Sequence, residues 1–162
     1  KKWTNIKKDK PKLNLHFVGK LQTNKAKDVV KLFDYVHSLE NIKQAEILSK
    51  HEKDFKKKLK YFIQVNISQE TQKSGINPSD VKLFFEACMY KYNLNIIGLM
   101  CLPPNDKFPE KHFNNMKDLK ISLQSSRQVT ELSMGMSNDY ISAINYGSTY
   151  IRIGTKIFGE RK

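Results

Sequence analysis

Arginine is scarce in this sequence although the chain is strongly basic. Only Arg127, Arg152 and Arg161 are arginines among 29 basic residues, and the formal net charge is +13. The planar guanidinium group of arginine normally dominates protein contacts with phosphates and bases of nucleic acids. The lysines are spread along expected solvent faces, so we expect a solvated basic surface and no nucleic-acid partner. A basic nucleic-acid-binding protein, driven by counterion release, is the alternative function.

Several other features are missing as well. The sequence has no run of about 18 apolar residues, and residues 1–8 lack the apolar centre of a signal peptide. We therefore expect a cytoplasmic protein without a membrane partner. The two cysteines, Cys88 and Cys101, do not have metal-binding spacing, so we expect buried, reduced thiols. The length of 162 residues and the hydrophobic fraction of 39% predict one globular domain, residues 1–162.

Strand-like and helix-like segments alternate along the whole chain. Six apolar stretches have the length and composition of β-strands, namely 13–19, 35–39, 60–67, 94–102, 129–134 and 149–154. Apolar residues at helical spacing lie between them, over 25–33, 42–58, 78–92, 109–123 and 138–146. This alternation predicts a parallel sheet with right-handed crossovers. Because 94–102 is apolar almost throughout, we expect that strand to be buried on both faces.

Two architectures share this alternation, the doubly wound open sheet and the (β/α) barrel. The open sheet usually carries a glycine-rich phosphate loop after an early strand, but no further glycine follows Gly19 within residues 20–25. A barrel binds phosphate in the loops after its last two strands, and the two best phosphate-binding candidates here follow the last two predicted strands. We therefore predict an α/β fold of the (β/α)8 TIM-barrel type, with about six of the eight βα units.

The first candidate segment is Ser133-Met-Gly-Met-Ser137, where a strand leads into a helix. Hydroxyl groups and backbone N–H groups there can converge on an anion at the positive end of the helix. Gly135 allows a close approach of the backbone. An equally simple interpretation is that Ser137 or Asn138 only caps the helix that follows.

The second candidate segment is Arg152-Ile-Gly-Thr155, at the end of the last predicted strand. Alternation along the strand points Arg152 away from the side of its isoleucine neighbours, and Gly154 and Thr155 are expected to form a loop. A guanidinium group in the barrel needs an anionic or acceptor partner. The alternative to a ligand is an ion pair with a carboxylate of the barrel, for which Glu131 is a candidate.

Six segments together resemble the pyridoxal phosphate homeostasis protein family. They are residues 16–25 (HFVGKLQTNK), 64–66 (QVN), 73–75 (KSG), 98–100 (GLM), 132–137 (LSMGMS) and 147–159 (GSTYIRIGTKIFG). The resemblance runs nearly end to end. It implies a barrel of the alanine racemase N-terminal type that binds pyridoxal 5'-phosphate (PLP), acts in intracellular PLP homeostasis and has no established catalytic turnover. The implied partners are PLP and, as recipients, PLP-dependent apoenzymes.

The resemblance also implies a set of cofactor-binding residues. Six residues match the family's positions: Ser133, Met136, Ser137, Arg152, Gly154 and Thr155. Ser133, Gly154 and Thr155 match phosphate-binding positions, and Arg152 matches the arginine that faces the pyridine nitrogen. A permanently charged guanidinium group beside that nitrogen disfavours protonation of the ring, which weakens the cofactor as an electron sink. Storage of the cofactor therefore fits better than broad catalysis.

One departure from the family matters. The family's Schiff-base lysine lies in a Val-Ser-Lys-like segment that ends its first strand, and its second strand ends in a Phe-Gly-Glu-Asn-like segment. Neither segment occurs in this sequence, which agrees with six predicted strands where a barrel needs eight. We therefore expect a truncated member that lacks the first two βα units. A PLP-dependent racemase-like enzyme needs such a lysine and an acid/base partner, so it is the weaker alternative.

Four further residues lie in or near predicted strands. For His16 and His37, an interior hydrogen-bonded role is more frequent than that of a general base. Asn66 and Met100 end their strands at the face where barrel sites form, so both are candidates for the pocket wall. Lys20 follows the first strand, but we expect it to be solvated.

Overall fold

The computed structural model describes residues 2–70, 72–104, 108–123 and 129–160. Within these residues the strands are β1 (His16–Phe17), β2 (Tyr35–Leu39), β3 (Lys60–Val65), β4 (Asn95–Cys101), β5 (Glu131–Met136) and β6 (Tyr150–Arg152). They form one sheet in the order β1-β2-β3-β4-β5-β6, and every neighbouring pair is parallel. The prediction of six parallel strands joined by helical crossovers is confirmed.

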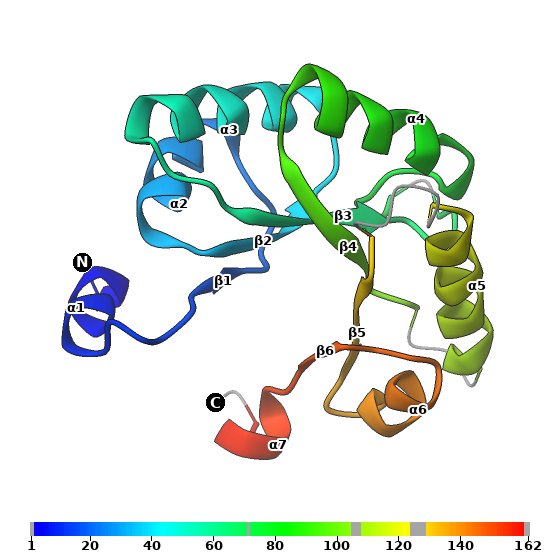
Figure 1. Cartoon of the computed structure of the whole chain (residues 1–162). Helices are drawn as coiled ribbons and strands as arrows, with labels where there is room; N and C mark the ends of the chain where they lie inside the picture. The colour runs from blue at the N-terminus through cyan, green and yellow to red at the C-terminus, as the bar shows by residue number, and fades with distance from the viewer. Residues whose placement is uncertain (1, 71, 105–107, 124–128, 161–162) are drawn as a thin grey trace.

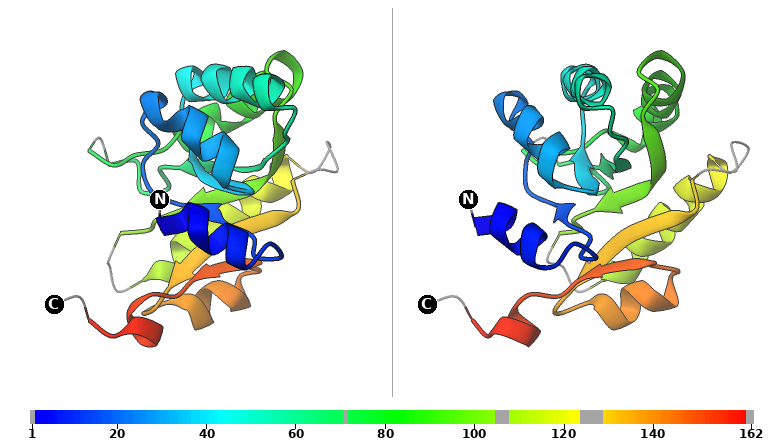
Figure 2. Two further views of the ribbon diagram at one scale, coloured as in Figure 1. Left: turned by 90° about the vertical axis from the view of Figure 1, so that its left-hand side faces the viewer. Right: turned by 60° about the vertical axis from the view of Figure 1, so that its left-hand side comes forward.

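Helices cover the outer face of the curved sheet (Figures 1 and 2). They are α2 (Ala26–Leu32), α3 (Ile42–Phe55), α4 (Val81–Glu86), α5 (Pro109–Ser122) and α6 (Tyr140–Asn145). Short turns η1 (Thr23–Lys25) and η2 (Pro78–Asp80) lead into α2 and α4, and the π-helical turn η3 (Ala87–Lys91) follows α4. Across the described part of the chain, none of the helices combines the length and the apolar character that a membrane crossing requires.

The sheet separates two apolar layers, because alternate residues of a strand point to opposite faces. On the helix side, Leu99 and Cys101 of β4 join the main core, together with most buried aliphatic residues. On the concave side, Met100 packs with Tyr35 and Phe62 in a smaller cluster. The expectation that the fourth strand is buried on both faces is confirmed. Cys88 and Cys101 are both buried and free, as predicted.

Several predicted boundaries differ from the structure. The first strand, expected over 13–19, is reduced to His16–Phe17, because as an edge strand it pairs only with β2. A helix α1 (Lys2–Asp9) precedes it; no helix was predicted there. Thr155 was expected in a loop but begins the short helix α7 (Thr155–Phe158), since the amides of residues 157 and 158 donate to the carbonyl of Gly154.

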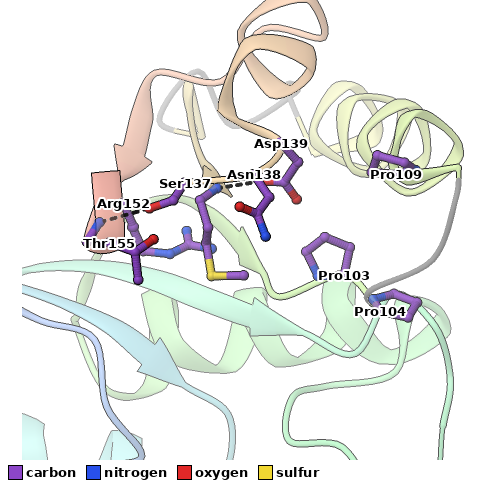
Figure 3. Close-up of a pocket in the computed structure, with 10 residues that line it drawn as sticks. Pro103, Pro104, Pro109, Ser137, Asn138, Asp139, Arg152 and Thr155 are labelled. Atoms are coloured by element: carbon purple, nitrogen blue, oxygen red, sulfur yellow. Dashed lines mark hydrogen bonds between the residues drawn. The ribbon is translucent and has the colours of Figure 1, made fainter. Parts of the chain in front are cut away.

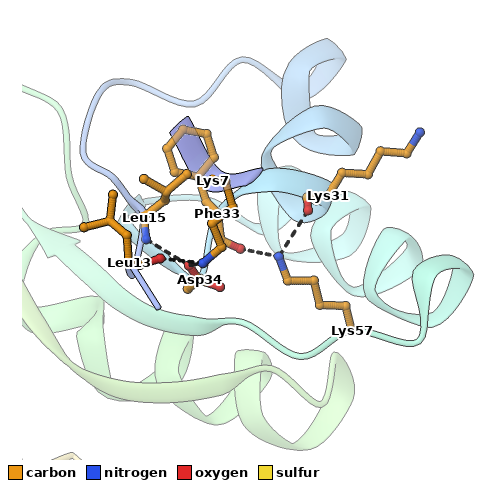
Figure 4. Close-up of polar contacts among 7 residues, drawn as sticks. All are labelled: Lys7, Leu13, Leu15, Lys31, Phe33, Asp34 and Lys57. Atoms are coloured by element: carbon orange, nitrogen blue, oxygen red, sulfur yellow. Dashed lines mark hydrogen bonds and ion pairs between the residues drawn. The ribbon is translucent and has the colours of Figure 1, made fainter. Parts of the chain in front are cut away.

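The carboxyl ends of β4, β5 and β6 meet at one edge of the sheet, as parallel pairing requires. The loops that follow these strands surround a pocket (Figure 3). The amino ends of the strands lie at the opposite edge, where Asp34 holds the N-terminal segment against the sheet (Figure 4).

Asp34 receives two hydrogen bonds from the N-terminal segment (Figure 4). Its Oδ2 accepts from Lys7 Nζ at 2.7 Å and from the amide of Leu15 at 2.8 Å. Nearby, Lys57 Nζ donates to the carbonyl of Phe33 at 2.6 Å. Partial burial raises the pKa of Asp34, but these hydrogen bonds and the charges of Lys7 and Lys57 outweigh it, so the pKa lies below its usual value. Asp34 is therefore stabilised as a carboxylate in the folded state.

We expect Asp34→Asn to lower the free energy of unfolding at neutral pH by about 1 kcal/mol, because it removes a partly exposed charged hydrogen bond. A carboxyl group with a lowered pKa contributes stability above about pH 4, and this contribution is lost as the pH falls below that value. The difference between the two proteins should therefore shrink on acidification. Urea unfolding at about pH 7 and about pH 3 measures it. Asp9→Asn, at an exposed position of α1, is the control; an equal loss in that variant contradicts the assignment.

Candidate functional site

The pocket at the carboxyl ends of the strands has a volume of about 560 Å³. Three loops line it, those after β4, β5 and β6 (Figure 3). The lining residues are Pro103, Pro104, Pro109, Met136, Ser137, Asn138, Asp139, Arg152, Gly154 and Thr155. Five of the six residues predicted to bind a cofactor are thus brought together: Met136, Ser137, Arg152, Gly154 and Thr155. Ser133 is not among the residues that line the pocket.

Ser137 joins the two predicted phosphate segments. Its Oγ accepts from the amide of Gly154 at 3.2 Å and from the amide of Lys156 at 3.4 Å. The alternative in which Ser137 or Asn138 caps α6 is wrong, because Asp139 occupies the N-cap position. Asp139 instead accepts from the amide of Met136 at 2.6 Å, which holds the turn before the helix. Two backbone N–H groups therefore converge beside the pocket on a hydroxyl oxygen.

Arg152 is half-buried and reaches into the pocket from the end of β6 (Figure 3). Its Nη1 donates to Ser133 Oγ at 2.7 Å, and its Nη2 donates to the carbonyl of Cys101 at 2.8 Å. The predicted alternative, an ion pair with Glu131, is wrong, because the carboxylate of Glu131 accepts from the hydroxyl of Thr130 instead. Burial lowers the pKa of Arg152, although a guanidinium group stays protonated in proteins. Both hydrogen-bond acceptors of Arg152 are therefore neutral, while the charge of Asp139 favours its protonated form.

Ser133 lies within β5 and is fully buried. Its Oγ contacts both Arg152 and His37 Nδ1, the latter at 2.9 Å. His37 Nε2 in turn lies 2.9 Å from His16 Nδ1. Both histidines are hydrogen-bonded as predicted, but only His37 is buried, whereas His16 is half-buried. Burial, together with the charges of His16 and Arg152, lowers the pKa of His37 to about 3, so the ring is neutral.

Other residues named from the sequence lie outside the pocket wall. Met100 is fully buried in the concave cluster, and Asn66 donates to the carbonyl of Glu70. Lys20 is exposed, as expected. The sequence reasoning missed Asp139 and the Pro103–Pro104 pair as wall residues. A strand-ending proline pair signals only a turn, and its position opposite Asn138 depends on the packing of three loops (Figure 3).

The chain matches known proteins over almost its whole length. The family model for the N-terminal domain of alanine racemase matches residues 6–162. A protein of Synechocystis named pyridoxal phosphate homeostasis protein is 40% identical over 154 residues, which cover 92% of this chain and 71% of the relative. The chain belongs to the pyridoxal phosphate homeostasis protein family. It spans about two thirds of the length of the curated family members it matches; the expected lack of two βα units stays a prediction.

Solved structures agree with this family membership. The structure of PipY from Synechococcus elongatus with PLP bound superposes with a TM-score of 0.86 at 31% identity, over 96% of this chain and 75% of that chain. Alanine racemase from Clostridium difficile gives a TM-score of 0.75 at 13% identity, over 98% of this chain and 42% of that chain. The second similarity shows the fold alone. The predicted alanine racemase N-terminal fold, with six βα units, is confirmed.

Proposed function

We propose that this chain binds PLP in the pocket formed by the loops after β4, β5 and β6 and serves in PLP homeostasis. The observation that carries the proposal is Arg152, a half-buried cation whose two hydrogen-bond acceptors, a hydroxyl and a carbonyl oxygen, are both neutral. A buried charge is costly unless an acceptor compensates it, and a ligand in the pocket can supply further acceptors. The PLP-bound relative of similar fold supports the choice of ligand.

A second group of donors, which lies beside Arg152 in the pocket wall, suits the phosphate group (Figure 3). The amides of Gly154 and Lys156 already converge on Ser137 Oγ, and a phosphate oxygen can accept from these amides and from the hydroxyl proton of Ser137. The exposed hydroxyl of Thr155 lies in the same wall. Asp139 is the one acidic residue among the lining residues, and its Oδ1 is engaged with the amide of Met136. The pocket therefore offers several donors to an anion. One oxygen of the Asp139 carboxylate already accepts from a backbone amide.

Arg152 suits the other end of the ligand. Two of its five N–H groups donate to Ser133 and Cys101, so the guanidinium group can still donate to a ring nitrogen. When bound, the pyridine ring of PLP supplies an electron sink, and a permanent positive charge beside its nitrogen weakens that function. Retention of the cofactor without turnover follows from this arrangement. PLP-dependent apoenzymes are the proposed recipients, and the cytoplasm is the proposed location.

The reactive aldehyde of PLP complicates a direct test, because the sequence contains 26 lysines. Pyridoxine 5'-phosphate has an alcohol in place of the aldehyde, so it reports only noncovalent contacts. We expect saturable binding of this probe to the whole chain in isothermal titration calorimetry. No binding to the unmodified chain would refute the proposed function. Binding that ignores Arg152→Leu and falls steeply with salt would support the polyanion alternative.

Ser137→Ala should weaken binding of pyridoxine 5'-phosphate about tenfold, the effect of one lost hydrogen bond to a charged group. The variant removes a hydroxyl group that lies between both phosphate segments. Ser142→Ala on α6 is the matched control, because that hydroxyl donates to Glu110 and Ser142 does not line the pocket. Equal affinities of the two variants would remove Ser137 from the site.

A further inference from the structure

A chain of hydrogen bonds runs from the barrel interior to the pocket cation. It connects His16 Nδ1 to His37 Nε2 at 2.9 Å, His37 Nδ1 to Ser133 Oγ at 2.9 Å, and Arg152 Nη1 to Ser133 Oγ at 2.7 Å. We infer that His37 is a positioning residue, which fixes the guanidinium group of Arg152 through Ser133. The functional part of this inference, selective contact with the pyridine ring, rests on the proposed function.

The chemistry of the donors sets the direction of the chain. A guanidinium group can only donate, so Ser133 Oγ accepts from Arg152. We assign the hydroxyl proton of Ser133 to the contact with His37 Nδ1, which then accepts and carries no proton. The proton of the neutral ring is on Nε2, from where it is donated to His16 Nδ1. This tautomer of His37 makes all three contacts and also accepts the hydroxyl proton of Ser133, whereas in the other tautomer Nδ1 would donate to Ser133 and could not accept that proton.

The surroundings of His37 favour this neutral tautomer. The ring is almost fully buried and stacks on Phe62, with ring centroids 4.3 Å apart and an interplanar angle of 17°. Tyr150 packs against it edge to face. His16, the next member of the chain, stacks on Tyr35 at 4.1 Å. Aromatic rings pack against both imidazoles. Within the described residues, the hydrogen-bond partners of His37 are His16 and Ser133, neither of which is a carboxylate that would stabilise a protonated ring.

Arg152 needs such positioning because it has free space on two sides. It lines the large pocket, and it also lines a second cavity of about 230 Å³ together with His16, His37 and Tyr150. A long side chain between two cavities can turn toward either one. The acceptors Ser133 Oγ and the carbonyl of Cys101 hold two of its nitrogens. The orientation of the Ser133 hydroxyl group, set by His37, therefore keeps a lone pair available for Arg152.

The first test needs neither a variant nor a ligand. Long-range proton–nitrogen NMR spectra of the whole chain, labelled at its four histidines, distinguish the two imidazole tautomers. We expect His37 to carry its proton on Nε2 and to keep it there between about pH 5 and pH 8. A proton on Nδ1, or a doubly protonated ring at neutral pH, would overturn the inference, because Ser133 would then have to accept from both neighbours.

The second test compares His37→Leu with His37→Asn. Leucine removes the acceptor for the Ser133 hydroxyl group, whereas the side-chain oxygen of asparagine can occupy a position near that of Nδ1 and accept from it. Three arginines occur in the sequence, so the side-chain signals of Arg152 can be assigned. We expect separate Nη signals, which report restricted rotation, in the unmodified chain and in His37→Asn. These signals should merge in His37→Leu while the backbone amide spectrum stays that of a folded chain.

Ligand affinities add a readout that a purely structural defect would not produce. His37→Leu should weaken the binding of pyridoxine 5'-phosphate about tenfold. The binding of inorganic phosphate should stay unchanged, because phosphate accepts hydrogen bonds from the amides of Gly154 and Lys156. Equal losses for both probes, or unchanged Arg152 signals in His37→Leu, would overturn the inference. If the unmodified chain binds neither probe while the tautomer and the Arg152 signals behave as expected, the proposed function fails and the positioning of Arg152 stands.

Discussion

Glu52→Ala should lower the free energy of unfolding by about 3 kcal/mol, because it leaves buried donors without an acceptor. Glu52 lies near the end of α3 and its side chain is 1% exposed. Its Oε1 accepts from the amide of Leu59 at 2.6 Å and from the hydroxyl of Tyr61 at 3.0 Å, and Lys58 Nζ lies 3.0 Å from Oε2. One carboxylate thus holds the connection between α3 and β3.

The neighbouring groups show how strongly this carboxylate is embedded. Burial, together with the charge of Glu52 and the hydrogen bond to it, raises the pKa of Tyr61, so the phenol remains a donor. Glu52→Gln keeps one oxygen for two donors and should cost less than Glu52→Ala. Glu46→Ala, on the exposed face of the same helix, should change stability by less than about 0.5 kcal/mol.

Urea unfolding followed by circular dichroism measures these differences. The connection between α3 and β3 lies at the amino ends of the strands, opposite the pocket. We therefore expect Glu52→Gln to bind pyridoxine 5'-phosphate like the unmodified chain. If Glu52→Ala were no less stable than Glu46→Ala, the central place of this carboxylate in the fold would be refuted.

Gly135→Ala is the second change with a large expected effect. Gly135 has φ +93°, a conformation in which a side chain is strained. A Cβ atom there would also lie 2.6 Å from Ala143 Cβ and 3.0 Å from Tyr140 Cα, so α6 would have to move. Strain and overpacking together should cost about 3 kcal/mol. Because the turn before α6 lines the pocket, affinity for pyridoxine 5'-phosphate should fall as well.

Gly147→Ala separates the two contributions. Gly147 has φ +88°, but among the described residues, its own chain neighbours aside, no heavy atom lies within 4 Å of a Cβ placed there. This variant should therefore show only the backbone strain, about 1 kcal/mol, and should keep its ligand affinity. The difference in urea unfolding between the two variants measures the contact with α6. If Gly135→Ala and Gly147→Ala lost the same stability and both still bound pyridoxine 5'-phosphate, α6 would be able to move without disturbing the pocket.

The strands were easier to predict than their ends. The segment 35–39 matches β2 residue for residue, because turn residues bound a short apolar run on both sides. By contrast, β1 depends on pairing with β2 alone, so the apolar run 13–19 overstates it. The helix α1 has few apolar residues, and Lys7 at Asp34 helps to hold it in place. A contact between residues 27 positions apart leaves no periodic signal in the sequence.

For the candidate site, too, some features could be predicted from the sequence and others could not. Met136, Ser137, Arg152, Gly154 and Thr155 could be named from two short motifs and the family resemblance, and the structure places all five around one pocket. The partners of Arg152 could not be named, because Cys101 comes from a different strand. Glu131, the partner expected from its charge, bonds to Thr130 instead. Local chemistry identifies a charged group, but only the packing of strands selects the atoms that face it.

The sequence alone determined the alternation of six strands and their connecting helices, the parallel sheet, the family and the two segments beside the pocket, because each depends on local hydrophobic period or on residues close together in the chain. The tertiary structure decided the role of Ser133. Its hydroxyl meets His37, 96 residues earlier, inside the curved sheet. The curvature of the open sheet brings β2, β5 and β6 around one interior, and no single segment encodes that curvature.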